Sequence, residues 1–256
     1  MQTLSVVGAE PDLAAVAERL DGRTATVVAG EVPAPETGAV TVTLSPDGDR
    51  QTRATDDSFS AVLDRLAPEY DHALVAGFSR LRLPTVVVGD REVPGRVVRR
   101  VEAAGELSAA ELAETVRSVE PYVTLASLVA RAKDAEGTDR SGALATFTGR
   151  VRAKDGPDDD RTTHLAFERY DEVAERRLAE IEAELAARDG VFGVWTHHRV
   201  GVIPDGEDIV FVVVLAGHRE EAFETVSDGI DRLKSEVPIF KKETTVSDEF
   251  WTHEHE

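Results

Sequence analysis

DRLKSEVPIFKKETTVSDEFW (Asp231–Trp251) changes from a helical to an extended pattern at Pro238. The apolar residues before and within this stretch recur at helical spacing and predict one buried stripe: Phe223, Val226, Ile230, Leu233 and Val237. Because a proline disfavours helical geometry in the residue before it, the helix should end there and residues 239–243 should be extended. The stretch therefore predicts a helix with Lys234 in its last turn, followed by a strand that presents Lys241.

Lysine is rare in the chain, and three of its five occurrences fall in this stretch. The five are Lys133, Lys154, Lys234, Lys241 and Lys242, whereas arginine is used freely. The compact ammonium of lysine has a pKa that its surroundings shift readily, so the cluster indicates a functional site. The alternative for Lys234 alone is that its stem lies along the edge of the apolar stripe while its charge stays in water.

The composition limits the classes of function. The 256 residues carry 49 Asp and Glu against 29 Lys and Arg, a formal charge of -20, which argues against a general binder of nucleic acid or membrane surfaces. The acidity is spread along the chain and predicts a salt-adapted surface, so we expect a halophilic, cytoplasmic protein. We recognise no signal peptide and no long apolar segment. With no cysteine, the chain has no disulfide, no thiolate metal site and no persulfide of its own.

The first 90 residues alternate strand-like and helical patterns, which predicts an α/β domain. The expected strands are 3–8, 24–30, 40–44, 72–78 and 85–90, and the expected helices are 11–20 and 58–66. Asp56 or Asp57 is the expected cap of the second helix. The domain should be P-loop NTPase-like but degenerate. In the frame G-x-x-x-x-G-K-[ST] laid from Gly8, the glycine, lysine and hydroxyl positions hold Leu13, Ala14 and Ala15.

This region also resembles the MobB family, an adaptor of molybdenum-cofactor dinucleotide synthesis. The resemblance rests on TLSVVG (Thr3–Gly8) and DHALVAGF (Asp71–Phe78), although Ala76 stands where members usually have an acidic residue. The alternative is any small α/β domain.

We expect the domain boundary near Pro121. Residues 91–120 have a mixed pattern and are expected to join the domains, with a capping box from Ser108 to Glu111 opening a short helix. The predicted domains are 1–120, a degenerate MobB-like domain plus the joining segment, and 121–256.

Residues 121–256 predict an α+β domain. The expected helices are 124–135, 172–188 and the one that carries Lys234; the expected strands are 142–152, 164–170, 194–201 and 208–217. Helix 172–188 should bury Val173, Leu178, Ile181 and Leu185. Arg150 and Arg152 should share one face of an extended chain. Ile209–Ala216 contains no polar residue, so this strand should be covered on both faces, in part by another subunit or by the first domain.

This second domain resembles the MoaE family, the large catalytic subunit of molybdopterin synthase. The motifs, in order, are GALATFTGRVR (142–152), HHRVG (197–201), GHREEAFE (217–224) and DRLKSEVPIFKKE (231–243), with Trp251 downstream. Phe240 stands where many members have Trp, and the chain ends soon after Trp251. The resemblance implies a MoaE-like fold and a sulfur-transfer function.

The resemblance further implies the substrate and the partner. Cyclic pyranopterin monophosphate would receive sulfur, in two rounds, from a small ubiquitin-like carrier protein whose C-terminal Gly-Gly thiocarboxylate enters the large subunit. Members work as a homodimer within a heterotetramer, and no cofactor is implied. The absence of cysteine agrees, because the sulfur rides on the partner. The implied substrate contacts are Phe147, Arg150, Val151, Arg152, His218, Arg219, Lys234, Lys241, Lys242 and Glu243.

Elementary chemistry assigns roles within this set. The guanidinium of arginine can donate two parallel hydrogen bonds to a phosphate, so Arg152 and Arg219 are expected to bind it, with His218 assisting. Proton transfers typically contribute about 10²–10⁴-fold to a rate. We expect Lys234 to be the principal acid and base, with a pKa lowered by its apolar edge and nearby cations. Lys241 is expected to be its partner or an electrostatic stabiliser.

One alternative function remains open from the sequence. The chain could instead be a non-catalytic pterin-binding or scaffold protein of molybdenum-cofactor assembly. A metal site is not expected, because His197 and His198 are neighbours on a strand and point to opposite faces, which favours a structural role. His253 and His255 offer at most weak adventitious metal binding.

Overall fold

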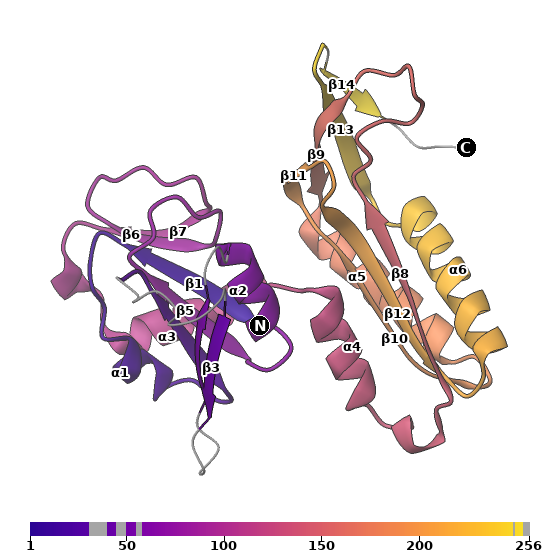
Figure 1. Ribbon diagram of the computed structural model, residues 1–256, viewed down its shortest axis with the longest axis horizontal. Coiled ribbons are helices and arrows are strands. Elements are labelled where there is room, and N and C mark those ends of the chain that lie inside the picture. Colours follow the sequence, from indigo (N-terminus) through magenta and orange to yellow (C-terminus); the bar gives the residue numbers. More distant parts are fainter. Residues whose placement is uncertain (31–39, 45–49, 55–57, 248, 253–256) are drawn as a thin grey trace. The chain divides into compact units, whose positions relative to one another are not determined.

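The computed structural model describes residues 1–30, 40–44, 50–54, 58–247 and 249–252. The chain divides into two compact units, Met1–Ala126 and Ser127–Glu256, each with its own apolar core (Figure 1). The division falls a few residues after the boundary expected near Pro121. Within the described residues, no helix combines the length and apolar character that a membrane span needs.

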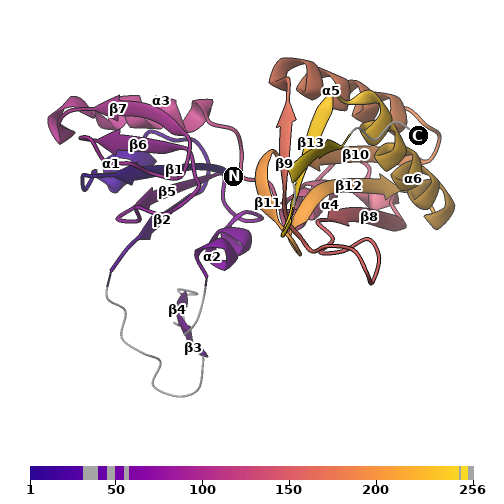
Figure 2. The ribbon, with the colours of Figure 1, turned by 90° about the horizontal axis from the view of Figure 1, so that it is seen from above.

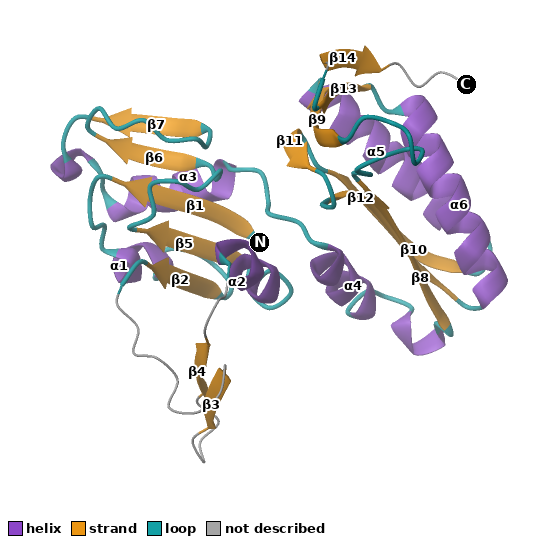
Figure 3. Cartoon of the chain, turned by 45° about the horizontal axis from the view of Figure 1, so that its top comes forward, coloured by secondary structure: helices purple, strands orange, loops and turns teal. Residues whose placement is uncertain are grey.

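A five-stranded parallel sheet forms the centre of the first unit. Its order is β2-β5-β1-β6-β7 (Figure 3). The strands are β1 (Gln2–Val7), β2 (Thr24–Val28), β5 (His72–Ala76), β6 (Thr85–Val88) and β7 (Val97–Val101). The expected strand at 40–44 is β3 (Val40–Leu44), which pairs with β4 (Arg50–Ala54) in a separate hairpin rather than joining this sheet.

Helices cover both faces of the parallel sheet, as a sheet of buried apolar strands requires. α1 (Leu13–Ala17) and α3 (Ala109–Ser118) share a core with the β1 residues Leu4 and Val6. α2 (Phe59–Leu66) packs Leu63 against a second cluster that includes Val75 of β5. A 3-10 turn, η1 (Ala104–Glu106), precedes α3.

Three expectations for the first unit need correction. Residues 91–120 are not a joining segment, because β7 pairs with β6 and α3 buries Leu112 and Val116 in the unit's core. The helix expected at 11–20 shrinks to the five residues of α1. Ser58 caps α2 by accepting a hydrogen bond from the Ala61 N–H at 3.1 Å, and Asp56 and Asp57 lie outside the described residues. The capping box from Ser108 to Glu111 is confirmed.

The second unit is built on two antiparallel sheets. The first has the order β10-β12-β8, with β8 (Ala143–Arg150), β10 (Val191–His198) and β12 (Asp208–Ala216). The second has the order β11-β9-β13-β14, with β9 (Thr162–Arg169), β11 (Gly201–Pro204), β13 (Ile239–Thr245) and β14 (Glu249–Thr252). The helices are α4 (Leu125–Lys133), whose first two residues precede the division between the units, α5 (Asp171–Ala186) and α6 (Arg219–Glu236), with a 3-10 turn, η2 (Thr138–Arg140).

The central strand β12 is buried along its length, as expected. One face carries Val212 and Val214 into the core that Ile181 and Leu185 of α5 complete. Figures 1 and 2 show α5 and α6 on that face and α4 on the opposite one. Val213, on the second face, is also fully buried within the single chain. The buried strand therefore gives no argument for a second subunit.

Two apolar positions on the helices differ from the expected stripes. Val173 of α5 and Phe223 of α6 are 43% and 65% exposed. Their neighbours Ala174 and Ala222 are buried in the core instead. The small alanines let both helices lie close to the sheet, and the larger side chains are turned outward.

Candidate functional site

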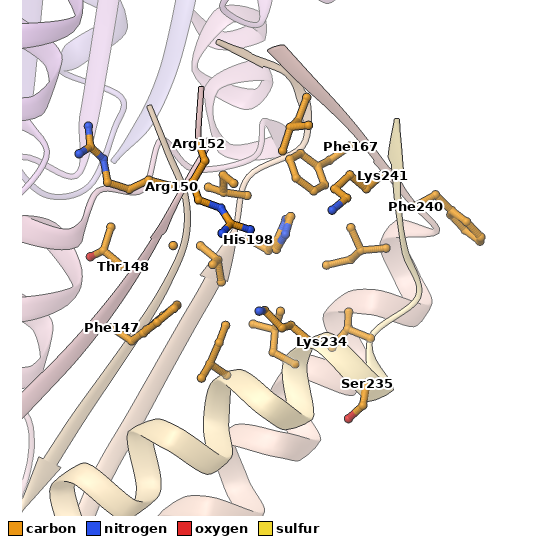
Figure 4. A pocket seen from close by; sticks show the side chains of 18 of the residues that line it. Phe147, Thr148, Arg150, Arg152, Phe167, His198, Lys234, Ser235, Phe240 and Lys241 are labelled. Carbon is orange, nitrogen blue, oxygen red and sulfur yellow. The ribbon is translucent and has the colours of Figure 1, made fainter. Parts of the chain in front are cut away.

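A cavity of about 940 Å³ lies in the second unit, where the end of α6 meets both sheets (Figure 4). Its size is in the range of sites for small organic molecules. Several elements contribute side chains to its wall, among them Phe147 on β8, Arg152 after it, Phe167 on β9, His198 on β10, Lys234 on α6, and Lys241 and Glu243 on β13. Residues far apart in the sequence thus meet at one place.

The end of α6 presents Lys234 to this cavity. The helix stops before Pro238, and its C-cap residue Val237 has the extended conformation expected there (φ -91°, ψ 125°). Leu233 and Val237 are buried and anchor the helix end on the core. Lys234 lies in the last turn of α6, as expected, and is exposed in the single chain.

A network of ion pairs fixes the last turn of α6 against α5. Arg232 bonds to Glu236 at 2.8 Å and to Glu184 at 2.5 Å, and Arg177 also bonds to Glu236. The hydrogen bond from Arg232 is the largest cause that lowers the pKa of Glu236 to about 2, and Arg177 adds to it. The network therefore holds the backbone that carries Lys234.

Strand β13 separates its two lysines. Lys241 and Glu243 line the cavity, whereas Lys242, between them, does not. The period of two in a strand explains this, because successive side chains point to opposite faces. The Glu243 carboxylate accepts a hydrogen bond from the hydroxyl of Thr162, which holds it at the cavity wall.

Arg150 and Arg152 both line the cavity, as their spacing on an extended chain predicts. β8 ends at Arg150, whose Nε lies 3.2 Å from the Asp208 carboxylate. Arg152 lies beyond the strand and pairs with Asp155 at 2.9 Å. The two arginines therefore share the cavity but pair with different carboxylates. Val151 does not line it; this residue is buried in the core.

His218 and Arg219 lie at the other end of α6. His218 is the N-cap residue, and Arg219 is the first residue of the helix. Arg219 and Lys234 are 15 positions apart, which at about 1.5 Å per residue is about 22 Å along the helix axis. Neither His218 nor Arg219 lines the cavity. A single chain therefore does not bring these two residues to the lysines.

His198 also lines the cavity, although its sequence context favoured only a structural role. Its side chain is 6% exposed, and burial lowers its pKa to about 4, with the nearby charge of Arg169 adding to the shift. His197 points the other way and stacks on Phe211 at 6.4 Å, which confirms that the pair faces opposite sides. Burial lowers the pKa of His197 to about 3. The alternation of side chains along a strand was the sequence signal that could have separated His198 from His197, because it places the two rings on opposite faces.

A metal is not needed to account for these side chains. Among the residues that the structure describes, no group of three or more His, Asp or Glu side chains could hold a metal ion. His253 and His255 lie outside the described residues. The cavity instead combines the donors Arg152, Lys234 and Lys241 with aromatic walls. Such a site can bind an anionic, ring-containing molecule and exchange protons with it through the lysines.

The family model described as MoaE protein matches residues 120–236. A relative from Haloferax volcanii, described as a probable molybdopterin synthase, is 51% identical over 261 residues, which covers 99% of this chain and 100% of the relative. The molybdopterin synthase catalytic subunit of Oryza sativa subsp. indica is 40% identical over 116 residues, covering 45% of this chain and 59% of the relative.

Two similar solved structures each match about half of the chain. The MoaE protein from Burkholderia ambifaria MC40-6 is 34% identical with a TM-score of 0.42, and the match covers 52% of this chain and 84% of that protein. The molybdopterin synthase from Staphylococcus aureus is 31% identical with a TM-score of 0.42, covering 45% of this chain and 82% of that protein.

Proposed function

The chain belongs to the molybdopterin synthase family, and we propose that the cavity at the end of α6 is where it carries out sulfur transfer to a pterin. It is a sulfur-transferring enzyme of molybdenum cofactor biosynthesis. The substrate proposed for the cavity is cyclic pyranopterin monophosphate. The observation that carries the proposal is that Arg152, Lys234 and Lys241 line one cavity of suitable size, although they come from distant parts of the sequence.

The proposed sulfur donor is a small carrier protein that ends in a Gly-Gly thiocarboxylate. The chain has no cysteine, so it cannot carry a persulfide, and the sulfur must arrive on another molecule. Glycine has no side chain, which suits a tail that must approach two lysines in a narrow space. The carrier's acyl group would lie beside Lys234 and Lys241 while its sulfur faces the pterin.

The side chains divide the work between binding and proton transfer. Arg152 is the proposed phosphate ligand, because a guanidinium donates two parallel hydrogen bonds to an oxyanion. Lys234 is the proposed acid and base for opening the cyclic phosphate and adding sulfur, with Lys241 as its partner or as a stabiliser of developing negative charge. Phe147 and Glu243 complete the wall. The family resemblance adds Lys242 and Val151, which the single chain places outside the cavity.

The experiment is product formation with the thiocarboxylated carrier. Lys234→Ala should lower turnover by about 10²–10⁴-fold while the thermal unfolding curve and carrier binding stay native. Lys133→Ala is the matched control, since Lys133 is also an exposed lysine of this unit and does not line the cavity. Native turnover by Lys234→Ala would exclude its role as acid and base.

His218 and Arg219 favour a homodimer. The resemblance makes them substrate contacts, yet they lie about 22 Å along α6 from Lys234 in the same chain. We therefore propose that a second copy brings its His218 and Arg219 to the cavity of the first. Chains with Lys234→Ala should then complement chains with Arg219→Ala, because a mixed dimer has one cavity with both native residues. No gain of turnover on mixing and re-forming the dimers would contradict this arrangement.

For the first unit we propose a degenerate P-loop NTPase-like, MobB-like adaptor that binds no nucleotide. The relative from Haloferax volcanii matches across both units, so the unit is part of its architecture too. The Asp12 carboxylate accepts a hydrogen bond from the Ala15 N–H at 3.0 Å at the start of α1. A carboxylate thus takes an N–H that a phosphate would need, and its charge would repel the phosphate. Calorimetry of the full chain with ATP and Mg²⁺ should show no binding; micromolar affinity would contradict the proposal.

A further inference from the structure

His198 presents an unprotonated nitrogen to the cavity. Its Nδ1 lies 2.7 Å from the backbone oxygen of Arg199. A carbonyl oxygen only accepts hydrogen bonds, so Nδ1 must carry the proton. Burial keeps the ring neutral near pH 7, since it lowers the pKa to about 4. The second nitrogen, Nε2, therefore has a free lone pair and acts as a hydrogen-bond acceptor.

The ring is held in this orientation. His198 is the last residue of β10 and pairs with Val210 of β12, so its backbone is fixed by the sheet. The ring packs edge-on against Phe167, with centroids 4.9 Å apart and planes at 73°. Nδ1 is tied to the Arg199 carbonyl at the same time. Among the described residues, no hydrogen bond from the protein reaches Nε2, although the side chain lines the cavity (Figure 4).

The charged groups that line the cavity are not suitable ligand-like partners for this nitrogen. The cations that line the cavity only donate hydrogen bonds, and the carboxylates there are engaged with partners in the protein. Asp155 pairs with Arg152, Glu236 with Arg232 and Arg177, and Glu243 accepts from Thr162. Nε2 is a neutral acceptor in a cavity of cations, and it suits a ligand group that donates a hydrogen bond without carrying negative charge.

We propose that His198 recognises an N–H or O–H group on the ring system of the bound substrate. The inference rests on the proposed function and deepens it, because it divides the cavity into two parts. A phosphate has no such donor near neutral pH, so it goes to Arg152 and the lysines. The heterocycle, which carries N–H groups, lies with its donor edge at Nε2. His198 thereby fixes which end of the substrate faces the sulfur donor.

Two substitutions separate this contact from a structural role. His198→Asn keeps a polar group near the position of Nδ1 but has no atom at Nε2. His198→Gln can place an amide oxygen near the position of Nε2. We expect the Asn variant to raise the KM for the pterin about 5- to 100-fold, because a buried donor on the substrate is left without an acceptor. The Gln variant should stay within about fivefold of native. The KM for the carrier protein should change in neither.

A thermal unfolding curve for each variant shows whether the fold is kept. Should the Asn variant fail to fold, the protonation state of the native protein still tests the proposal. Nitrogen NMR of histidine-labelled native protein should show a neutral ring with the proton on Nδ1 between about pH 5.5 and pH 8. Adding the pterin should shift the Nε2 resonance.

Several outcomes would overturn the inference: a native KM in His198→Asn, equal damage from Asn and Gln in folded variants, or a proton on Nε2. These outcomes are distinguishable from failure of the proposed function. If Lys234→Ala abolishes turnover while His198→Asn keeps its native KM, only the role of His198 is lost. If Lys234→Ala turns over normally, the proposed function fails whatever His198 does.

Discussion

Removing the carboxylate of Asp155 should tighten the binding of the anionic substrate. Asp155 holds the Arg152 guanidinium at 2.9 Å, and both residues line the cavity. A phosphate that binds Arg152 must compete with this carboxylate. Asp155→Asn keeps the size of the side chain and removes its charge, so Arg152 becomes available without a packing change.

The exposure of the pair limits the size of the effect. The side chains of Arg152 and Asp155 are 75% and 67% exposed, and such surface ion pairs contribute about 0.2–1 kcal/mol. Since about 1.4 kcal/mol corresponds to a tenfold change in an equilibrium constant, the gain in affinity is at most about fivefold. Salt should reduce it further, because the Debye length falls from about 10 Å at 0.1 M to about 3 Å at 1 M.

The assay is substrate affinity, measured by calorimetry at several salt concentrations at which circular dichroism shows a folded protein. Asp158→Asn is the matched control, because it removes the same charge from the same loop without touching the pair with Arg152. In an Arg152→Ala background, Asp155→Asn should give little or no gain. Weaker binding by Asp155→Asn, or an equal gain in Asp158→Asn, would show that Asp155 does not compete with the substrate for Arg152.

The remaining predictions concern the lysine strand, the core and acid stability. Lys241→Ala should lower turnover more than Lys242→Ala in the carrier assay, because only Lys241 lines the cavity; equal losses would count against the geometry. Ile181→Ala should cost about 2–5 kcal/mol in a urea titration, since its side chain is fully buried. Val173→Ala on the same helix, 43% exposed, should change stability by less than about 0.5 kcal/mol. Glu236 has its pKa lowered from 4.5 to about 2, so its stabilising contribution is present above pH 4.5 and is lost as the pH falls toward 2. Glu236→Gln should therefore flatten the decline of the unfolding temperature between those pH values, and an unchanged slope would contradict the role of the ion pairs.

Much of the first unit follows from local pattern, but its extent does not. The apolar strands of its sheet were predicted from the sequence, because both faces of a parallel sheet are buried and its strands are therefore continuous apolar runs. The edge strand β7, with the sequence VVRRV, alternates poorly, and its first residue is 40% exposed. Without the pairing to β6, that segment looks like a connection. Membership of a sheet is a long-range property, which short-range periodicity does not report.

In the second unit, the local sequence was enough to predict the helix that ends before Pro238 and the strand that follows, because proline acts on its own neighbours. It also determined that Lys234 and Lys241 are presented by different elements, and the order of the motifs indicated the family. The folded chain was needed to show that β8 ends at Arg150, that Arg152 pairs with Asp155, and that His198 faces the cavity. It also decided that His218 and Arg219 lie away from the lysines in a single chain. Such placements depend on the register between strands and on the rigid length of α6, and both relate residues that are far apart in the sequence.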